Sequence, residues 1–141
     1  MITNALITIF NRKLTENGEC LIPTVIYDAT WYYGRGYSVG TVNNQFIDNS
    51  DAYYVRIPYG ADTSGKTFIE PFDWKNLEDA QVSEYWTIQT DDIIVRGEMR
   101  DTVADQTDIA SVTEQFFVVN SFANNTTRGS DLVKHWRIGG V

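Results

Sequence analysis

The sequence predicts a mainly β protein: a small antiparallel β-barrel or sandwich with one short helix and long polar loops. Aromatic residues make up 13% of the 141 residues and are accompanied by many Thr, Val and Ile, which are the residue types that strands favour. Six or seven short apolar or alternating segments are separated by turn residues. Strand–helix–strand units that would indicate a parallel sheet are absent. At this length we expect a single domain over residues 1–141.

The N-terminal half contains four candidate strands. Residues 4–10, NALITIF, form the first, and ENG at 16–18 supplies a turn. Residues 24–33, TVIYDATWYY, form a strong strand, and a weaker one covers residues 37–47. Residues 52–59, AYYVRIPY, alternate between apolar and polar positions. That alternation is typical of an antiparallel strand with one face in solvent.

The C-terminal half contains the predicted helix and three further strands. The helix covers residues 73–85, with Asp73 as a candidate N-cap and acidic residues in its early turns. Strands are expected at residues 92–97, 116–122 and 132–140. Taken together, these segments favour a barrel or sandwich of short antiparallel strands.

The net charge of −8 is unevenly distributed. Residues 70–114 hold twelve acidic and three basic residues, which gives this segment a charge of −9. Such a balance argues against a sequence-independent nucleic-acid binder. It favours either a solvated acidic surface or one that meets a basic partner and keeps DNA from adhering. Within it, the polar stretch at about 98–115 is compatible with a loop, a frayed helix or a flexible acidic arm.

Residues 60–67, GADTSGKT, match the phosphate-loop pattern G-x-x-x-x-G-K-[ST]. A phosphate loop needs a helix that begins at the Lys-Thr, so that backbone N–H groups meet the phosphates. Pro71 follows too soon for a helix of that kind, and Pro58 fits poorly in the central strand that should lead in. We therefore interpret the segment as a polar turn rich in Gly, Ser and Asp.

Other chemistry-bearing residues are few. The single cysteine, Cys20, allows no internal disulfide and fits a reducing cytoplasm. It is expected to be a small buried or half-buried filler. His135 alternates with Trp136, so one of the two should face the core and the other outward, and His135 is expected to have a structural or interface role. One His and one Cys cannot build a zinc site. We expect no enzyme activity and no cofactor or metal, although a carboxylate-pair hydrolase stays open because acidic residues are plentiful.

Two acidic groups could suggest a divalent cation. Asp91 and Asp92 are adjacent, and neighbouring side chains on a strand point to opposite faces, so they should not converge. Asp101, Asp105 and Asp108 lack the glycine and the terminal Glu of a calcium loop. Solvated charge is the better interpretation of both groups.

Tyrosines gather around the second and fourth candidate strands. They could form a stacking platform for single-stranded nucleic acid. Only Arg35 and Arg56 lie nearby to attract phosphates, so packing and a protein interface are better interpretations. The aromatic residues concerned are Trp31, Tyr32, Tyr33, Tyr37, Tyr53, Tyr54 and Tyr59.

Several short sequence motifs occur in a specific order along nearly the whole chain. In these motifs and their order, the chain resembles a family of small proteins encoded in the structural-gene clusters of tailed phages and prophages. They are Trp31, IP at 57–58, YWTIQ at 85–89, DIIVRG at 92–97 and HWRIGG at 135–140. The chain departs from this pattern at Asp91, where the relatives have Gly, and in the length of residues 100–114. The C-terminal motif at 135–140 is also similar to that of head-completion, or stopper, proteins.

The resemblance implies a non-enzymatic virion assembly protein, a head–tail connector or head-completion component in the neck of the particle. The partners it implies are further copies in a ring, the portal or adaptor and tail proteins, with passing DNA met only by non-specific proximity. No membrane, cofactor or small-molecule substrate is expected, and the chain would move from the host cytoplasm into the virion. A tail completion or tail tube protein is the alternative, and a small hydrolase or nucleotide-binding protein a distant one. Interface candidates are Tyr53, Tyr59, Trp86, Asp91, Asp92, Asp101, Asp105 and Asp108.

Overall fold

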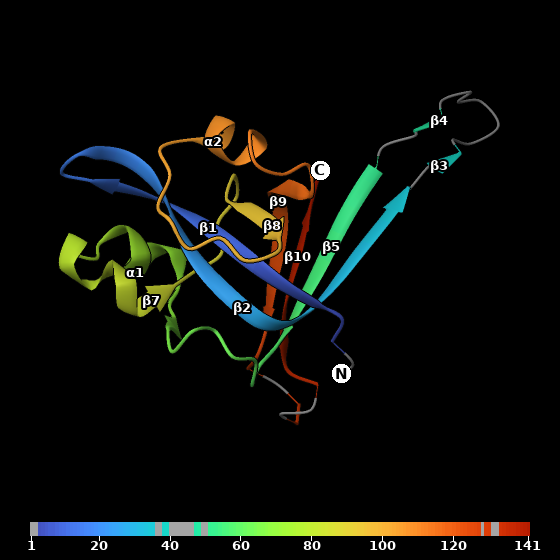
Figure 1. The fold of residues 1–141 in the computed structure, drawn as a ribbon. Helices are drawn as coiled ribbons and strands as arrows, with labels where there is room; N and C mark the ends of the chain where they lie inside the picture. Colours follow the sequence, from blue (N-terminus) through green and yellow to red (C-terminus); the bar gives the residue numbers. More distant parts are fainter. Residues whose placement is uncertain (1–2, 36–37, 40–46, 49–50, 128, 131–132) are drawn as a thin grey trace.

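Six antiparallel strands close into a barrel in the order β1-β2-β5-β10-β9-β8. The computed structural model describes residues 3–35, 38–39, 47–48, 51–127, 129–130 and 133–141 (Figure 1). The prediction of a mainly β fold is confirmed, and of the two architectures left open the chain adopts the barrel. The barrel strands are β1 Ala5–Thr15, β2 Gly18–Arg35, β5 Asp51–Pro58, β8 Ile93–Arg96, β9 Phe116–Asn125 and β10 His135–Gly140.

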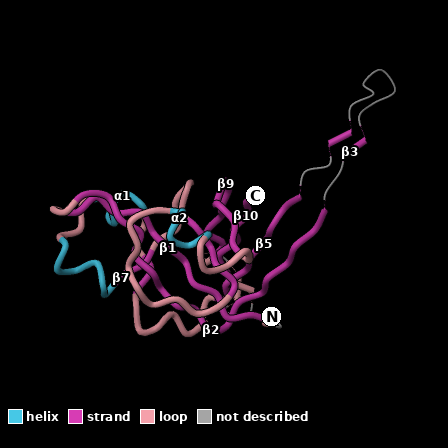
Figure 2. Tube along the Cα trace, turned by 45° about the horizontal axis from the view of Figure 1, so that its top comes forward, coloured by secondary structure: helices cyan, strands magenta, loops and turns pink. Residues whose placement is uncertain are grey.

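Two short strand pairs lie outside the barrel. β3 (Ser38–Val39) pairs with β4 (Ile47–Asp48), and β6 (Thr67–Phe68) runs parallel to β7 (Tyr85–Trp86). The weaker strand predicted over residues 37–47 falls largely outside the described residues, and its described ends are β3 and β4. Figure 2 shows the β2–β5 pair extending from one side of the barrel and the first helix on the other side.

The prediction of a single continuous helix over residues 73–85 is wrong. The chain forms a short α1 (Pro71–Lys75), which begins after Glu70, and a separate 3₁₀ helix (Asp79–Glu84). Trp74 is the buried residue of α1, and the 3₁₀ helix has none. A stripe of apolar residues this thin cannot hold a longer amphipathic helix on the barrel. Within the described residues, no helix has the length and apolar character required to cross a membrane.

β1 and β2 extend beyond the predicted strands because polar residues continue the pairing. Their register runs from Ala5↔Ala29 to Thr15↔Gly18, and Gly18 adopts a φ of 101° at the turn. Asn11 and Lys13 are buried in this extension. Polar residues usually mark the end of a buried strand. Here the buried side chains of Asn11 and Lys13 both have hydrogen-bond partners. Lys13 Nζ, for example, donates to the carbonyl oxygen of Lys75 in α1 (3.2 Å).

The segment at 98–115 packs against the outside of the barrel. It contains α2 (Gln106–Ala110), whose start is held by a capping box between Asp105 and Asp108. A backbone bridge joins Val103 to Leu21 in β2. Ile109 from α2 is completely buried in a cluster with residues that point outward from the barrel. The other members of that cluster are Phe10, Leu21, Ile93 and Val95.

The main core fills the barrel interior. Trp31 from β2 lies 5.4 Å from Phe117 of β9, and Trp136 from β10 lies 5.0 Å from Trp86, measured between ring centroids. The predicted alternation of β5 is confirmed, because Val55 and Ile57 are buried while Tyr54 and Arg56 are exposed. All six barrel strands contribute to this cluster or to the one beneath α2.

Candidate protein-interaction surface

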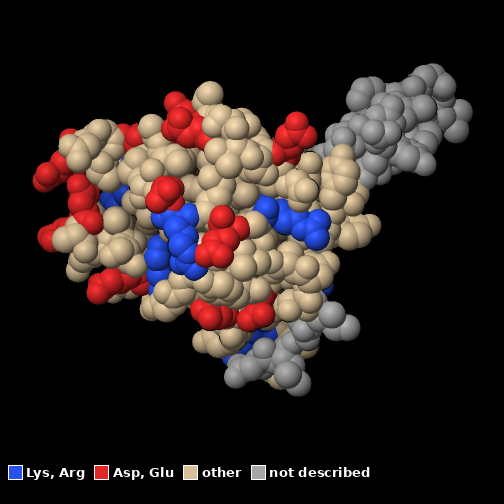
Figure 3. All heavy atoms as spheres, viewed as in Figure 1, with Lys and Arg blue, Asp and Glu red and all other residues tan. Residues whose placement is uncertain are grey.

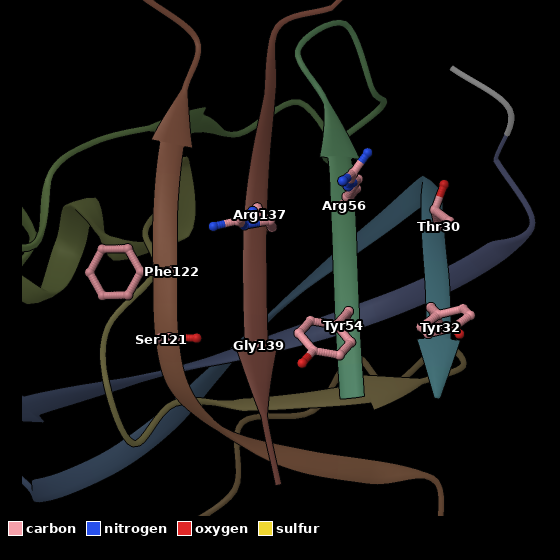
Figure 4. Close-up of a pocket in the computed structure, with 8 residues that line it drawn as sticks. All are labelled: Thr30, Tyr32, Tyr54, Arg56, Ser121, Phe122, Arg137 and Gly139. Carbon is pink, nitrogen blue, oxygen red and sulfur yellow. The ribbon is translucent and has the colours of Figure 1, made fainter. Parts of the chain in front are cut away.

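The barrel has one covered outer face and one bare outer face. Residues 98–115 cover the outside of β1 and β8, as described above. On the outside of β2, β5, β10 and β9 there is instead an open groove with a volume of about 560 Å³ (Figure 4). We call this groove the sheet groove. Its lining residues are Thr30, Tyr32, Tyr54, Arg56, Ser121, Phe122, Arg137 and Gly139.

Strand register arranges the sheet groove in two rows. In one row Thr30 pairs with Arg56, and Arg56 pairs with Arg137. In the other row Tyr32 pairs with Tyr54, and Tyr54 pairs with Gly139. Figure 4 shows the two rows crossing the strands one above the other. The rows follow from the two-residue period of a strand, which places alternate side chains on the same outer face.

The tyrosine row offers rigid aromatic surface to solvent. Tyr32 is 63% and Tyr54 47% exposed, and their ring centroids lie 6.3 Å apart. Gly139 provides the space beside Tyr54: a Cβ at this position would lie 3.7 Å from the Tyr54 ring and 2.8 Å from Ser121 Oγ. A side chain at position 139 would therefore displace Ser121 and fill the floor of the groove.

The arginine row places two like charges directly opposite each other. Arg56 and Arg137 are exposed register partners on neighbouring strands, and their guanidinium groups point apart in Figure 4. Like charges in this relation destabilise a sheet by themselves. Among the residues that the structure describes, no partner forms an ion pair with either arginine side chain. Sequence reasoning used Arg56 only as a weak sign of phosphate binding and missed Arg137, since their proximity depends on the pairing of β5 with β10.

The interface candidates predicted from the sequence differ in their exposure to solvent. Trp86 is 1% and Asp92 0% exposed, so both are corrected from interface to interior residues. Tyr53 is half-buried, stacking on Phe117 with centroids 5.2 Å apart. Tyr59 is exposed, with Lys134 Nζ 5.3 Å from its ring centroid.

The remaining candidates, Asp91, Asp101, Asp105 and Asp108, are all exposed. Asp105 and Asp108 are engaged in capping α2, where Thr107 N donates to Asp105 (2.9 Å). Asp91 and Asp92 do not converge, as expected from the sequence, because Asp91 adopts a φ of 75° and Asp92 turns into the protein.

Asp92 is the most strongly perturbed carboxyl group of the described chain. Burial raises its pKa to about 7, although hydrogen bonds from Arg12, Asn11 and Gln89 act in the opposite direction. Its oxygens accept from Arg12 N at 2.9 Å, from Asn11 Nδ2 at 2.7 Å and from Gln89 N at 3.0 Å. Every one of these donors is a neutral amide, so the arrangement serves to hold the chain together at the start of β8.

The phosphate-loop match at 60–67 lacks the required geometry. Thr67 begins the short strand β6 where a phosphate loop needs a helix, and Ser64 and Gly65 adopt left-handed φ values of 60° and 76°. Lys66 Nζ donates to Pro23 O (2.8 Å) and Thr24 Oγ1 (2.9 Å). Half-buried on the side of the barrel, Lys66 has its pKa lowered by burial. The interpretation as a polar turn is confirmed.

The remaining reactive residues occupy ordinary positions. Cys20 is half-buried as expected, with Sγ 3.7 Å from Lys13 O, and burial is the main cause that raises its pKa. His135 is half-buried at the start of β10, with Nδ1 2.8 Å from Val133 O, and the neighbouring Trp136 faces the core. Within the described ranges, no three His, Cys, Asp or Glu side chains gather as a metal ion would require.

Comparison with known protein families gives one match that covers almost the whole chain. Residues 2–141 match DUF6751, described as a family of unknown function. No curated protein and no solved structure matches the chain.

Proposed function

This chain belongs to DUF6751, a family of unknown function, and from its own residues we propose that it is a non-enzymatic assembly protein of tailed-phage particles. In this proposal the chain is a head–tail connector, or head-completion component, of the neck. It forms a ring with further copies of itself and contacts the portal or adaptor on one side and tail proteins on the other.

The sequence motifs that resemble phage structural-cluster proteins contribute their large apolar residues to the core. Trp31, Ile57, Trp86 and Trp136 are all buried in the main cluster of the barrel. Residues in such positions specify the fold, which a small β-barrel can use for many purposes. The functional argument therefore also needs a surface feature.

That feature is the sheet groove, and it is the observation that carries the proposal. Tyrosine and arginine are enriched at protein interfaces. Tyrosine provides a large contact area at a small cost in conformational entropy, and arginine provides several hydrogen-bond donors. The sheet groove exposes two residues of each type on a rigid sheet. A surface of this composition supports binding to another protein.

A tail completion or tail tube protein is the second candidate. Both would use a small β-barrel and a bare sheet face in the same way, and they differ from a neck protein in the number of copies per particle. In either case the chain is expected in the host cytoplasm during assembly and in the virion afterwards, with DNA passing nearby without specific contact.

Quantitative mass spectrometry of purified particles, normalised to the portal protein, tests the proposal. We expect a copy number comparable to that of the portal. A many-fold excess over the portal would reassign the chain to the tail tube. Absence from the particle would reject a virion role.

A further inference from the structure

The arginine row presents two exposed positive charges that could receive a negatively charged partner. Arg56 and Arg137 carry like charges at directly paired positions. Both are exposed, and within the described residues neither is neutralised by a carboxylate. A carboxylate bound to either guanidinium group would neutralise its charge, because guanidinium groups bind carboxylates through paired hydrogen bonds.

The tyrosine row makes a protein carboxylate a better partner than a phosphate backbone. Tyr32 and Tyr54 provide aromatic surface next to the arginines, as in protein interfaces. A nucleic-acid surface requires an extended basic field, whereas this chain has a net charge of −8. Two arginines on a chain of this net charge do not form such a field.

A suitable acidic surface exists on the chain itself. Residues 70–84 hold five acidic residues and one basic residue, and they form α1 and the 3₁₀ helix. We call this region the acidic end. Acidic side chains gather over it in Figure 3, which has the same orientation as Figure 1. All five carboxylates of the acidic end are exposed: Glu70, Asp73, Glu78, Asp79 and Glu84.

Most of the acidic end lies away from the sheet groove within one chain. Its first residue, Glu70, reaches β9, where Asn124 Nδ2 donates to Glu70 Oε1 (3.4 Å). In Figures 1 and 2, α1 lies on the opposite side of the barrel from β5, one of the strands that forms the groove. Two complementary surfaces on opposite sides of a molecule produce a head-to-tail contact between copies. Contacts of this type close into rings when the rotation between copies allows it.

We propose that the sheet groove of one copy binds the acidic end of the next copy, with Arg56 and Arg137 paired to carboxylates such as Glu78 and Glu84. This inference rests on the ring assembly of the proposed function and names the two surfaces that form the ring contact.

A charge exchange tests the contact. Sedimentation velocity of the full chain measures self-association at low and at high salt. We expect Arg56→Glu with Arg137→Glu to weaken self-association by about tenfold or more, since the repulsion of like charges replaces attraction. Adding Glu78→Lys and Glu84→Lys to the same chain restores opposite charges across the contact, so we expect association to return.

Arg96→Glu is the matched control for each single arginine substitution. Arg96 is exposed on β8, away from the sheet groove, and its substitution changes the net charge equally. We expect it to leave self-association unchanged. Circular dichroism of each variant establishes that the barrel is intact, which is expected because all the substituted residues are exposed.

Several results would overturn the inference. A chain that stays monomeric at low salt and high concentration has no such contact. If Arg96→Glu and Arg137→Glu weakened self-association equally, the effect would come from the net charge of the chain and not from a contact at the sheet groove. Binding of a short DNA duplex that is lost in the Arg56→Glu/Arg137→Glu variant would assign the arginines to nucleic acid.

Failure of this inference is distinguishable from failure of the proposed function. Portal-like copy number in the particle, with no effect of the charge substitutions, would retain the neck role and reject the sheet groove as the ring contact. Self-association through the sheet groove, with no chain in the particle, would retain the contact and reject the neck role.

Discussion

Asn11 Nδ2 donates a hydrogen bond of 2.7 Å to Asp92 Oδ2, and both side chains are completely buried. Asn11 also donates to Thr87 O (2.7 Å) and accepts from Thr87 N (3.2 Å). One amide side chain therefore connects β1 to two points of the 87–92 segment that leads into β8. This polar connection lies beside the β1–β8 pairing that helps to close the barrel.

Removing the carboxyl group of Asp92 should destabilise the fold. Asp92→Ala leaves the buried N–H donors of Asn11 and Arg12 without their acceptor, and we expect a loss of about 1–3 kcal/mol in the free energy of unfolding. Urea titration at neutral pH measures it. Asp101→Ala removes an exposed carboxyl group and should change stability by less than about 0.5 kcal/mol. Equal losses for the two variants would contradict a structural role of Asp92.

Stability should decrease as the pH rises from about 4 to about 7. Burial raises the pKa of Asp92 from 3.8 to about 7, so within this window the folded chain retains a proton that the unfolded chain has released. The stabilisation is complete below the unfolded pKa and is lost as the pH passes the folded one, at about 1.4 kcal/mol for each unit of difference. Asp92→Asn cannot titrate. Urea titrations between pH 4 and 8 should show a smaller slope for this variant, and an unchanged slope would contradict the assignment to Asp92.

Gly140 should tolerate no side chain. A Cβ at this position would lie 2.1 Å from Val118 O and 2.4 Å from Phe117 Cδ2. We expect Gly140→Ala to lower the free energy of unfolding by about 3 kcal/mol or more, because backbone of β9 has to move. Gly60→Ala is the control, since no atom lies within 4 Å of its added Cβ. Thermal melts should place Gly140→Ala far below wild type and Gly60→Ala close to it.

Asp91 should be replaceable by glycine with a gain in stability. Its φ of 75° is a left-handed conformation, which costs a residue with a Cβ about 1–2 kcal/mol and costs glycine nothing. We expect thermal stability in the order Asp91→Gly, wild type, Asp91→Ala, with Asp in the middle because its short polar side chain tolerates this region. A reversed order would show that the Asp91 side chain makes a stabilising interaction of its own.

Mg²⁺ and ATP should not stabilise the protein through the GADTSGKT segment. Lys66 holds the turn against β2 by its bonds to Pro23 O and Thr24 Oγ1, so Lys66→Met should lower the melting temperature with and without nucleotide. A nucleotide-dependent rise in the melting temperature that Lys66→Met abolishes would restore the phosphate-loop interpretation.

Local patterns account for the parts of the fold that the sequence predicted correctly. The alternation in residues 52–59 identified Val55 and Ile57 as inward-facing, and both are buried. The same reasoning placed one of His135 and Trp136 inside, and Trp136 is the buried one. Turn chemistry that includes Gly18 located the turn at 16–18. The helix over 73–85 failed because its stripe of apolar residues was taken as continuous, whereas only Trp74 finds a buried position in α1.

By itself, the sequence determined the strand-rich character of the chain, the alternation of buried and exposed positions along β5, and the polar turn at 60–67. These depend on neighbours in sequence, through the two-residue period of strands and the preferences of turn residues. Only the tertiary structure decided the barrel closure, the burial of Asn11 and Asp92, and the meeting of Arg56 with Arg137. Each of these joins residues about eighty positions apart. Such pairings depend on which strands become neighbours, and alternation within a single strand contains no information about that choice.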